Sequence, residues 1–381
     1  MKKVIFLIVV LQVSVGAMAQ NNALARVEND DKMYGFINKK GEMAIPAKFE
    51  DAGNFSNGLA AAHNGDKWGY IDSKGKWKIQ PIYEHVKEFN SGIGIVEIDG
   101  KWEYINKSGE ILNIAKSEKL YDFQNGVAFV RNGNLVGLMN TKGEIIVEPK
   151  FLKITGFYNG YSRFVGQSGK WGILDKKGNV IVEAKYDDIG NYVNQVAWVK
   201  NGEQFGLVSG NEYTKIDVDK IWDFAPGEEL TYARKNDLIG FVNKKGKWVV
   251  PPTFEAAKRF SSGLAPVYNG DDWGFIDKTG KYVIAPQYKS VEIFSEAGLA
   301  PVEIKGEWGF IDTKGNLVIE PKYQINVDGL FGNIFANNKK GFINGTARVE
   351  YKNDKGFIDK KGNVLGNTWY RSVGPFVEIV P

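Results

Sequence analysis

Few residues of this chain are suited to chemistry. Its 381 residues include two histidines, His63 and His85, and no cysteine. A zinc site or a nucleophile–histidine pair needs more of these side chains than the chain supplies. The sequence also lacks the phosphate-binding, dinucleotide-binding, zinc-protease and nucleophile-elbow motifs. We therefore expect no catalytic residues, no metal site and no cofactor, and a protein that is not an enzyme.

Carboxylates are plentiful, and a pair of them in a groove could cleave a glycosidic bond. Five aspartates, however, recur at one place, three residues before a glycine: Asp72, Asp175, Asp277, Asp312 and Asp359. Because Asp can hydrogen-bond the backbone two residues further on, we interpret them as turn formers. A carbohydrate-active site, with two carboxylates beside exposed tryptophans, stays open as an alternative.

Aromatic side chains that break a local pattern are the remaining candidates for binding. Trp77, Trp248 and Tyr282 stand where equivalent segments of the chain have Val180 or Leu317. Exposed rings can stack on sugar faces or anchor a protein partner. We predict that these three residues bind a ligand or partner. The alternative is that they fill local voids.

These residues belong to a repeat that runs through the chain. The phrase Trp-Gly-aromatic-Ile-Asp is clearest from Trp68 and from Trp273. Its second position recurs at steps of 34 or 35 residues, with a last step of 47, at Gly35, Gly69, Glu103, Gly137, Gly172, Gly206, Gly240, Gly274, Gly309 and Gly356. Such a period indicates an array of one supersecondary unit that packs on its neighbours. We expect one repeat region over 20–381, weakest over about 198–232 and longer over about 308–355.

Each unit reads as three antiparallel strands and a connector. In the eighth unit we expect strands over 263–268, 273–277 and 281–284. Asn269-Gly270 between the first two favours a tight hairpin turn, and Pro286 after the third cannot donate to a strand ladder. No helical periodicity follows the first residues of the chain. The predicted fold class is therefore all-β, built from three-stranded meanders.

Recurring aromatic residues predict how the units pack. Phe55, Phe89, Phe260 and Phe294 precede the first strand of their units, and we assign them to a stacked core. The glycine after each Trp leaves a gap where a ring or backbone can lie close. We predict that each Trp packs across to a neighbouring unit near its Gly, which would make the Trp-Gly pair the stacking joint.

The first 19 residues have the features of a signal peptide. Lys2 and Lys3 precede an apolar stretch, and Ala17 and Ala19 form a small-residue cleavage pattern, so the mature chain should start at Gln20. The whole chain carries a formal charge of +4 with both signs mixed, and no basic stripe for nucleic acid is visible. We expect export to the periplasm, cell surface or medium, no transmembrane segment after cleavage and no nucleic-acid partner.

The repeated phrase resembles that of the bacterial WG-repeat family. The best matches start at Trp68, Trp171, Trp273 and Trp308, and the resemblance covers nearly all of the mature chain in about ten repeats. It implies a β-rich repeat region, common in exported bacterial proteins, with no general activity and no shared catalytic residues. One departure is Glu103, which fills the glycine gap in the third unit.

Two arrangements fit ten such units. Propellers usually close with four to eight blades, so we favour an open or gently curved array, with two five-unit propeller-like rings as the alternative. Residues 375–380 look like one further first strand, suited to an end cap. We expect an exported, non-enzymatic scaffold that binds a protein or a cell-envelope polymer such as a glycan. The alternatives are a glycan-binding or carbohydrate-active protein and a structural spacer.

Overall fold

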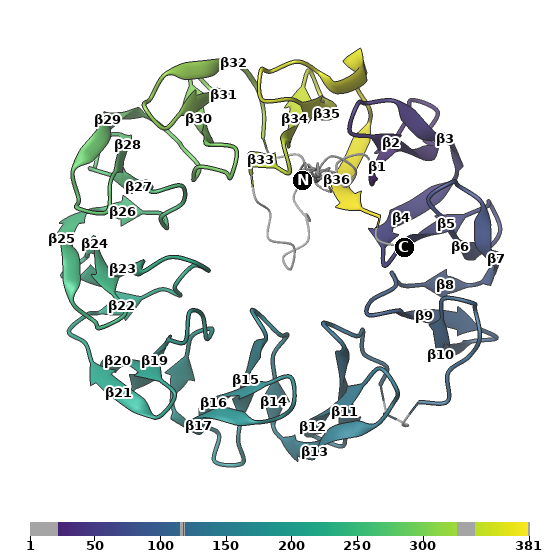
Figure 1. Cartoon of the computed structure of the whole chain (residues 1–381), viewed down its shortest axis with the longest axis horizontal. Helices are drawn as coiled ribbons and strands as arrows, with labels where there is room; N and C mark the ends of the chain where they lie inside the picture. Colours follow the sequence, from purple (N-terminus) through teal and green to yellow (C-terminus); the bar gives the residue numbers. More distant parts are fainter. Residues whose placement is uncertain (1–21, 115–116, 118, 326–339, 380–381) are drawn as a thin grey trace, which may run out of the picture.

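The computed structural model describes residues 22–114, 117, 119–325 and 340–379. In this part of the chain, ten small antiparallel sheets stand side by side in a ring (Figure 1). Each sheet corresponds to one repeat, and we call the sheets blades 1 to 10 in chain order. The predicted signal peptide, 1–19, lies outside the described residues, and so does segment 326–339 of the long ninth unit.

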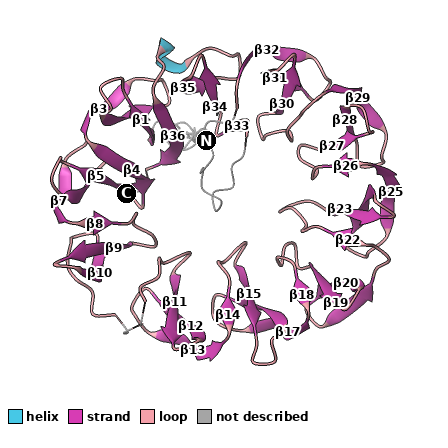
Figure 2. Ribbon diagram, turned by 180° about the vertical axis from the view of Figure 1, so that it is seen from behind, coloured by secondary structure: helices cyan, strands magenta, loops and turns pink. Residues whose placement is uncertain are grey.

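The strands take four positions from the inner to the outer side of the ring (Figures 1 and 2). The innermost strands are β36 (Ser372–Glu378) in blade 1, then β4 (Asp51–Ser56), β8 (His85–Val86), β14 (Lys153–Ile154), β18 (Asp188–Ile189), β22 (Lys220–Ile221), β26 (Ala256–Ala257) and β33 (Phe342–Ile343). The second are β1 (Ala23–Glu28), β5 (Leu59–His63), β9 (Ile93–Ile98), β11 (Val127–Asn132), β15 (Tyr161–Val165), β19 (Ala197–Asn201), β23 (Leu230–Lys235), β27 (Ala265–Tyr268), β30 (Leu299–Ile304) and β34 (Thr346–Tyr351).

The third and fourth positions complete the meander. The third strands are β2 (Tyr34–Asn38), β6 (Trp68–Ile71), β10 (Lys101–Asn106), β12 (Leu135–Asn140), β16 (Trp171–Asp175), β20 (Gln204–Ser209), β24 (Leu238–Asn243), β28 (Trp273–Ile276), β31 (Glu307–Asp312) and β35 (Asp354–Ile358). The outermost are β3 (Met43–Phe49), β7 (Trp77–Tyr83), β13 (Ile145–Phe151), β17 (Val180–Tyr186), β21 (Glu212–Lys215), β25 (Trp248–Phe254), β29 (Tyr282–Tyr288) and β32 (Leu317–Tyr323). One 3-10 helix, η1 (Leu365–Asn367), precedes β36.

The ring is closed by the end of the chain, so the open array that we favoured is wrong, and so is the pair of five-unit rings. Strand β36 pairs antiparallel with β1, with Val27 opposite Val373. The last segment therefore supplies the innermost strand of blade 1. We predicted a first strand used as an end cap. The strand exists, but its innermost place joins blade 10 to blade 1 and leaves no terminal unit to blunt.

The turn between the third and fourth strands forms as predicted. In blade 2 the Asp72 carboxylate accepts backbone hydrogen bonds from Lys74 at 2.9 Å and Lys76 at 3.0 Å. Gly75 follows with φ of 73°, in the left-handed region that favours glycine. The recurring aspartates are thus explained by turn formation.

The blades are joined by pairs of buried aromatic rings. An aromatic residue of the third strand meets a phenylalanine on the inner segment of the next blade, at centroid distances of 4.6 to 5.5 Å. The pairs are Phe36–Phe55, Tyr70–Phe89, Tyr104–Phe123, Phe241–Phe260, Phe275–Phe294 and Phe310–Phe342. These rings are almost fully buried. The prediction that Phe55, Phe89, Phe260 and Phe294 form a stacked core is confirmed.

The Trp-Gly pair has a different role from the stacking joint that we predicted. A Cβ on Gly69 would lie 2.6 Å from the Ile79 carbonyl oxygen and 2.7 Å from the Pro81 nitrogen, both on β7 of the same blade. The register between β6 and β7 shifts there, so β7 bulges across the glycine. Trp68 itself is half-buried beside the cluster between blades 2 and 3. The glycine therefore serves its own blade, because the bulged strand needs that space.

Blade 3 shows what happens when this glycine is absent. Glu103 takes its place, and among the described residues the sheet has the order β10-β9-β8, without an outermost strand. After the turn, pairing with β10 extends to the Ile105–Ile111 bridge and to a hydrogen bond from the Leu112 amide to the Tyr104 carbonyl. A side chain at position 103 occupies the space that a bulged strand would cross.

In the described part of the chain, no helix has the length and hydropathy of a membrane-spanning segment.

Candidate functional site

The inner side of the ring carries a repeated tight turn. In seven blades two consecutive residues at this turn have positive φ, the pattern of a type I′ turn. The pairs are Asn57-Gly58, Ser91-Gly92, Asn125-Gly126, Asn159-Gly160, Asn194-Gln195, Ser262-Gly263 and Asn344-Gly345. Asn and Gly tolerate this backbone region, and that explains their recurrence at this point of the unit.

Side chains of these turns bond one blade to the next. The Asn57 amide oxygen accepts a hydrogen bond from the Gly92 amide at 2.6 Å, and Ser91 Oγ accepts one from the Gly126 amide at 2.8 Å. Ser261 donates to the Phe294 carbonyl at 2.6 Å, and Ser262 donates to the Ser295 carbonyl at 3.0 Å. Polar groups on the inner side thus serve the assembly of the ring itself.

Two tyrosines add bonds of the same kind. Tyr70 donates to the Lys87 carbonyl at 2.7 Å, and Tyr104 donates to the Tyr121 carbonyl at 2.8 Å, in each case reaching the next blade. Burial raises the pKa of Tyr70 well above its usual range and raises the pKa of Tyr104 to about 12. Both hydroxyls are therefore protonated donors at neutral pH.

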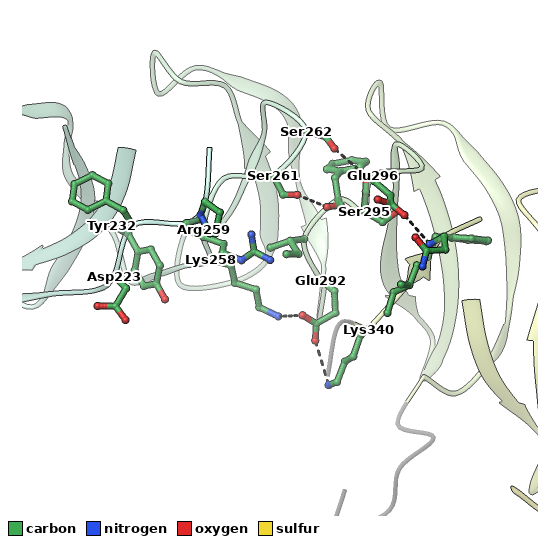
Figure 3. A pocket seen from close by; sticks show the side chains of 18 of the residues that line it. Asp223, Tyr232, Lys258, Arg259, Ser261, Ser262, Glu292, Ser295, Glu296 and Lys340 are labelled. Carbon is green, nitrogen blue, oxygen red and sulfur yellow. Dashed lines mark hydrogen bonds and ion pairs between the residues drawn. The ribbon is translucent and has the colours of Figure 1, made fainter. Parts of the chain in front are cut away.

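A cleft of about 980 Å³ opens on the inner segments of blades 7 to 10 (Figure 3). Asp223 and Tyr232 come from blade 7, and Lys258 and Arg259 follow β26 in blade 8. Glu292 and Glu296, on the segment before β30, and Lys340, before β33, complete the charged lining. Its volume is at the upper end of the range of small-molecule sites in proteins.

Most charges of the cleft are paired within the protein. Glu292 binds Lys258 at 2.7 Å and Lys340 at 3.3 Å, so one carboxylate bridges three blades (Figure 3). Asp223 accepts hydrogen bonds from the Trp198 indole at 2.7 Å and from the Asn191 side chain at 2.7 Å. The Asp223 contacts therefore link blades 6 and 7, and the Glu292 contacts link blades 8, 9 and 10, along the inner side.

Arg259 is the exception in this lining. Its half-buried guanidinium projects into the cleft (Figure 3) and has no hydrogen bond or ion pair with any described residue. Tyr232 lies close to it: burial and Asp223 raise the pKa of the Tyr232 hydroxyl, and Arg259 lowers it. That hydroxyl likewise has no hydrogen-bond partner among the described residues, although its ring stacks on Trp222 at 4.6 Å. The arrangement offers two unused donors to a ligand.

The structure does not bring the three predicted binding residues together in one place. Trp77, Trp248 and Tyr282 begin the outermost strands β7, β25 and β29, and β7 lies across the ring from the other two (Figure 1). Each ring contacts the preceding blade: Trp77 meets Phe49 at 5.7 Å and Tyr282 meets Phe254 at 6.1 Å, while Trp248 packs on the cluster between blades 6 and 7. Void filling accounts for these contacts, and binding through these residues stays a prediction.

Sequence reasoning missed the inner cleft. Asp223, Lys258, Arg259, Glu292 and Lys340 lie in the connectors and Tyr232 lies in β23, and no repeated motif marks these six residues as a group. One signal was present, because Lys258-Arg259 puts two cations just before Phe260 while no other unit does so. Using that signal requires knowing that this position faces the inner side of a closed ring.

In the described part of the chain, no cluster of three or more His, Asp or Glu residues could hold a metal ion.

Ten meander blades around one axis define a β-propeller. The WG containing repeat family model matches residues 34–68, 68–102, 104–135, 137–171, 171–205, 239–271, 273–308 and 308–324. These matches cover most of the chain, and the protein belongs to this WG-repeat family. No curated protein sequence matches it significantly.

Several solved structures are similar to this chain at low identity. A eukaryotic initiation factor is 12% identical, with a TM-score of 0.45, over 78% of this chain and 95% of that one. BamB from Moraxella catarrhalis is 11% identical, with a TM-score of 0.30, over 73% of this chain and 95% of that one. Kluyveromyces lactis Hsv2 is 12% identical, with a TM-score of 0.32, over 67% and 96% respectively.

Proposed function

We propose that this protein is an exported, non-enzymatic binding scaffold that holds a protein or cell-envelope polymer on the inner side of its ring. The observation that carries the proposal is the cleft of about 980 Å³ over blades 7 to 10, with the Arg259 guanidinium unpaired in it. Free donors in a concave site are what a binding partner can use.

The distribution of the other side chains supports this assignment. The aromatic pairs and the turn hydrogen bonds join neighbouring blades. These groups therefore offer few contacts to a partner. Glu292 holds Lys258 and Lys340 in place, and Asp223 is itself held by Trp198 and Asn191. A preorganised site loses less conformational entropy on binding than a flexible one.

A glycan-binding role on the outer rim is the second candidate. Tyr282 is 39% exposed, and its neighbours Val283 and Leu317 are similarly exposed. Trp248 and Tyr282 start adjacent outermost strands, so a sugar could stack on this part of the rim. A carbohydrate-active site would need in addition a carboxylate pair in a groove.

A retention experiment tests both candidates. Mature protein from Gln20 to Pro381 is immobilised and exposed to envelope and culture-medium fractions, beside a panel of glycans and peptidoglycan. We expect a saturable partner that Arg259→Gln weakens about tenfold or more, because a charge-assisted bond of 1.5–3 kcal/mol is lost.

The triple variant Trp77→Ala, Trp248→Ala, Tyr282→Ala is the comparison. Loss of binding by this variant alone, with the fold intact by circular dichroism, would move the site to the outer rim. The absence of saturable binding in every fraction would reject the scaffold and favour a structural spacer.

A further inference from the structure

The cleft over blades 7 to 10 has an unmet electrostatic requirement. Arg259 carries a full positive charge at every accessible pH, is half-buried, and has no acidic partner among the described residues. The nearby carboxylates are engaged elsewhere, because Glu292 binds two lysines, Asp223 accepts from Trp198 and Asn191, and Glu296 accepts from the Asn344 amide. A partly desolvated cation without a counter-charge is costly, and an incoming anion would remove that cost.

The chemistry of the lining selects the anion. A guanidinium presents a planar fork that matches the two oxygens of a carboxylate. The Tyr232 hydroxyl is a second free donor on the neighbouring blade. Lys258 and Lys340 already share Glu292, so Arg259 is the cation of the lining that forms no ion pair with a described residue, and a single guanidinium suits a single carboxylate.

The residues that line the cleft also indicate whether a sugar or a protein segment carries that carboxylate. A sugar site normally offers an open aromatic face. Here Phe224, Phe294 and Phe342 are 3%, 0% and 2% exposed. Tyr232 stacks on Trp222, whose ring also lies under the Lys220 ammonium at 4.8 Å. Paired charges of both signs line the rest of the cleft, as suits a protein segment with mixed polar side chains.

We propose that the Arg259 cleft binds a carboxylate of a protein partner, an acidic side chain or a chain end, with Arg259 forking the carboxylate and Tyr232 donating beside it. This inference rests on the proposed scaffold function and adds the chemical class of the bound group.

Two synthetic probes distinguish the effect of the carboxylate from the effect of the molecule that carries it. One is a fluorescent peptide of repeating Glu-Gly-Ser units, with its Gln-Gly-Ser counterpart. The other is polygalacturonate, which carries the same carboxylate on a sugar. Anisotropy titrations use the whole mature protein. We expect saturable binding of the Glu peptide, weak or no binding of the Gln peptide, and weaker binding at high salt, because exposed charges are screened.

Substitutions assign the effect to Arg259. We expect Arg259→Gln to weaken binding of the Glu peptide about tenfold or more, and Arg259→Lys to restore part of it, because an ammonium keeps the charge and loses the fork. Arg131→Gln is the matched control, since Arg131 lies in blade 4 and bonds the Gly133 carbonyl. It should bind as the unchanged protein does. Thermal unfolding checks that each variant is folded.

Other outcomes would overturn the inference. Binding of the Glu peptide that Arg259→Gln leaves unchanged, or no binding of either carboxylate probe, rejects the carboxylate site. Binding of polygalacturonate alone, lost in Arg259→Gln, rejects a protein partner in favour of an acidic glycan. If a partner from the envelope fractions still binds Arg259→Gln, the scaffold function stands and the carboxylate site falls. If nothing binds in either experiment, both fall.

Discussion

At the scale of single residues, the repeat is explained by steric needs more than by chemistry. The glycine of each Trp-Gly phrase makes room for a bulged strand, as Gly69 does against Ile79 and Pro81. The same contact recurs at Gly274 with the Ile284 carbonyl and the Pro286 nitrogen, both at 2.7 Å. Glycine is needed there because any Cβ would overlap backbone atoms that cannot rotate away.

A matched pair of substitutions in blade 2 tests this. Gly69→Ala should destabilise the protein by about 1–3 kcal/mol, the usual cost of overpacking. Gly53→Ala should be nearly neutral, because its Cβ would lie 3.5 Å from the Ala61 Cβ, an ordinary contact. Denaturant unfolding of both variants measures the difference. Equal stability of the two would show that the bulge does not depend on the glycine.

The sequence allowed part of this to be predicted. The aspartate turns and the buried phenylalanines follow from local patterns, because Asp72 and Phe260 have counterparts at the same position of several other units. The role of Gly69 could not be read in the same way, since a gap beside a Trp fits either a neighbouring ring or a bulge. Arg259 was missed because its lack of a partner is a property of three blades together.

At the scale of elements, each blade is a weak unit that depends on its neighbours. Phe275 packs between blades 8 and 9, while Ile276, next along β28, packs between blades 7 and 8. Both faces of the sheet are therefore buried, which a three- or four-stranded meander cannot achieve alone. The inner turns add directional bonds to this packing, and those bonds set the spacing between blades.

The contribution of a single inner-turn hydrogen bond to stability can be measured. Ser261→Ala removes the bond to the Phe294 carbonyl and should cost about 0.5–1.5 kcal/mol, the usual net contribution of one hydrogen bond. Ser209→Ala is the control, since Ser209 is exposed. Thermal unfolding compares the two variants. A loss in Ser209→Ala as large as in Ser261→Ala would contradict a role of the inner turn in joining blades.

Strands were predictable because turn residues bound them on both sides. In the eighth unit we expected strands over 273–277 and 281–284, close to β28 and β29. The longer β29 includes Pro286, which we took as a stop. The proline is accommodated because β29 is an outer edge strand and bulges at that point. Blade 3 has no fourth strand among the described residues and carries Glu103 in place of the glycine, whereas blade 10 lacks that strand and keeps Gly356.

At the scale of the whole molecule, closure decides what faces inward. Because β36 completes blade 1, the ten inner segments form one continuous surface around the axis (Figure 2). Arg371 adds an ion pair to Glu28 at 3.3 Å, and Ser372 donates to the same carboxylate at 2.9 Å. Closure also covers the inner edge of β1, which would otherwise be free to recruit another chain.

Local sequence patterns do not predict this closure. Ten repeats lie outside the usual size of propellers, and the curvature per unit depends on how neighbouring blades wedge together. Strand β36 has the composition of many other strands here, such as β9. Its pairing with β1 joins residues at opposite ends of the chain, and no local pattern records that contact.

The measurement that tests the account most directly is a cross-link across the closure. The chain has no native cysteine, so Val27→Cys with Val373→Cys, which face each other between β1 and β36, gives a clean reporter. Opposite residues on antiparallel strands are close enough for a disulfide. We predict near-complete intramolecular oxidation in the monomer, seen by mass spectrometry, and none for Val27→Cys paired with Val267→Cys of blade 8. Free thiols in the first pair, or disulfides only between separate chains, would contradict the closed ring and with it the inner binding surface.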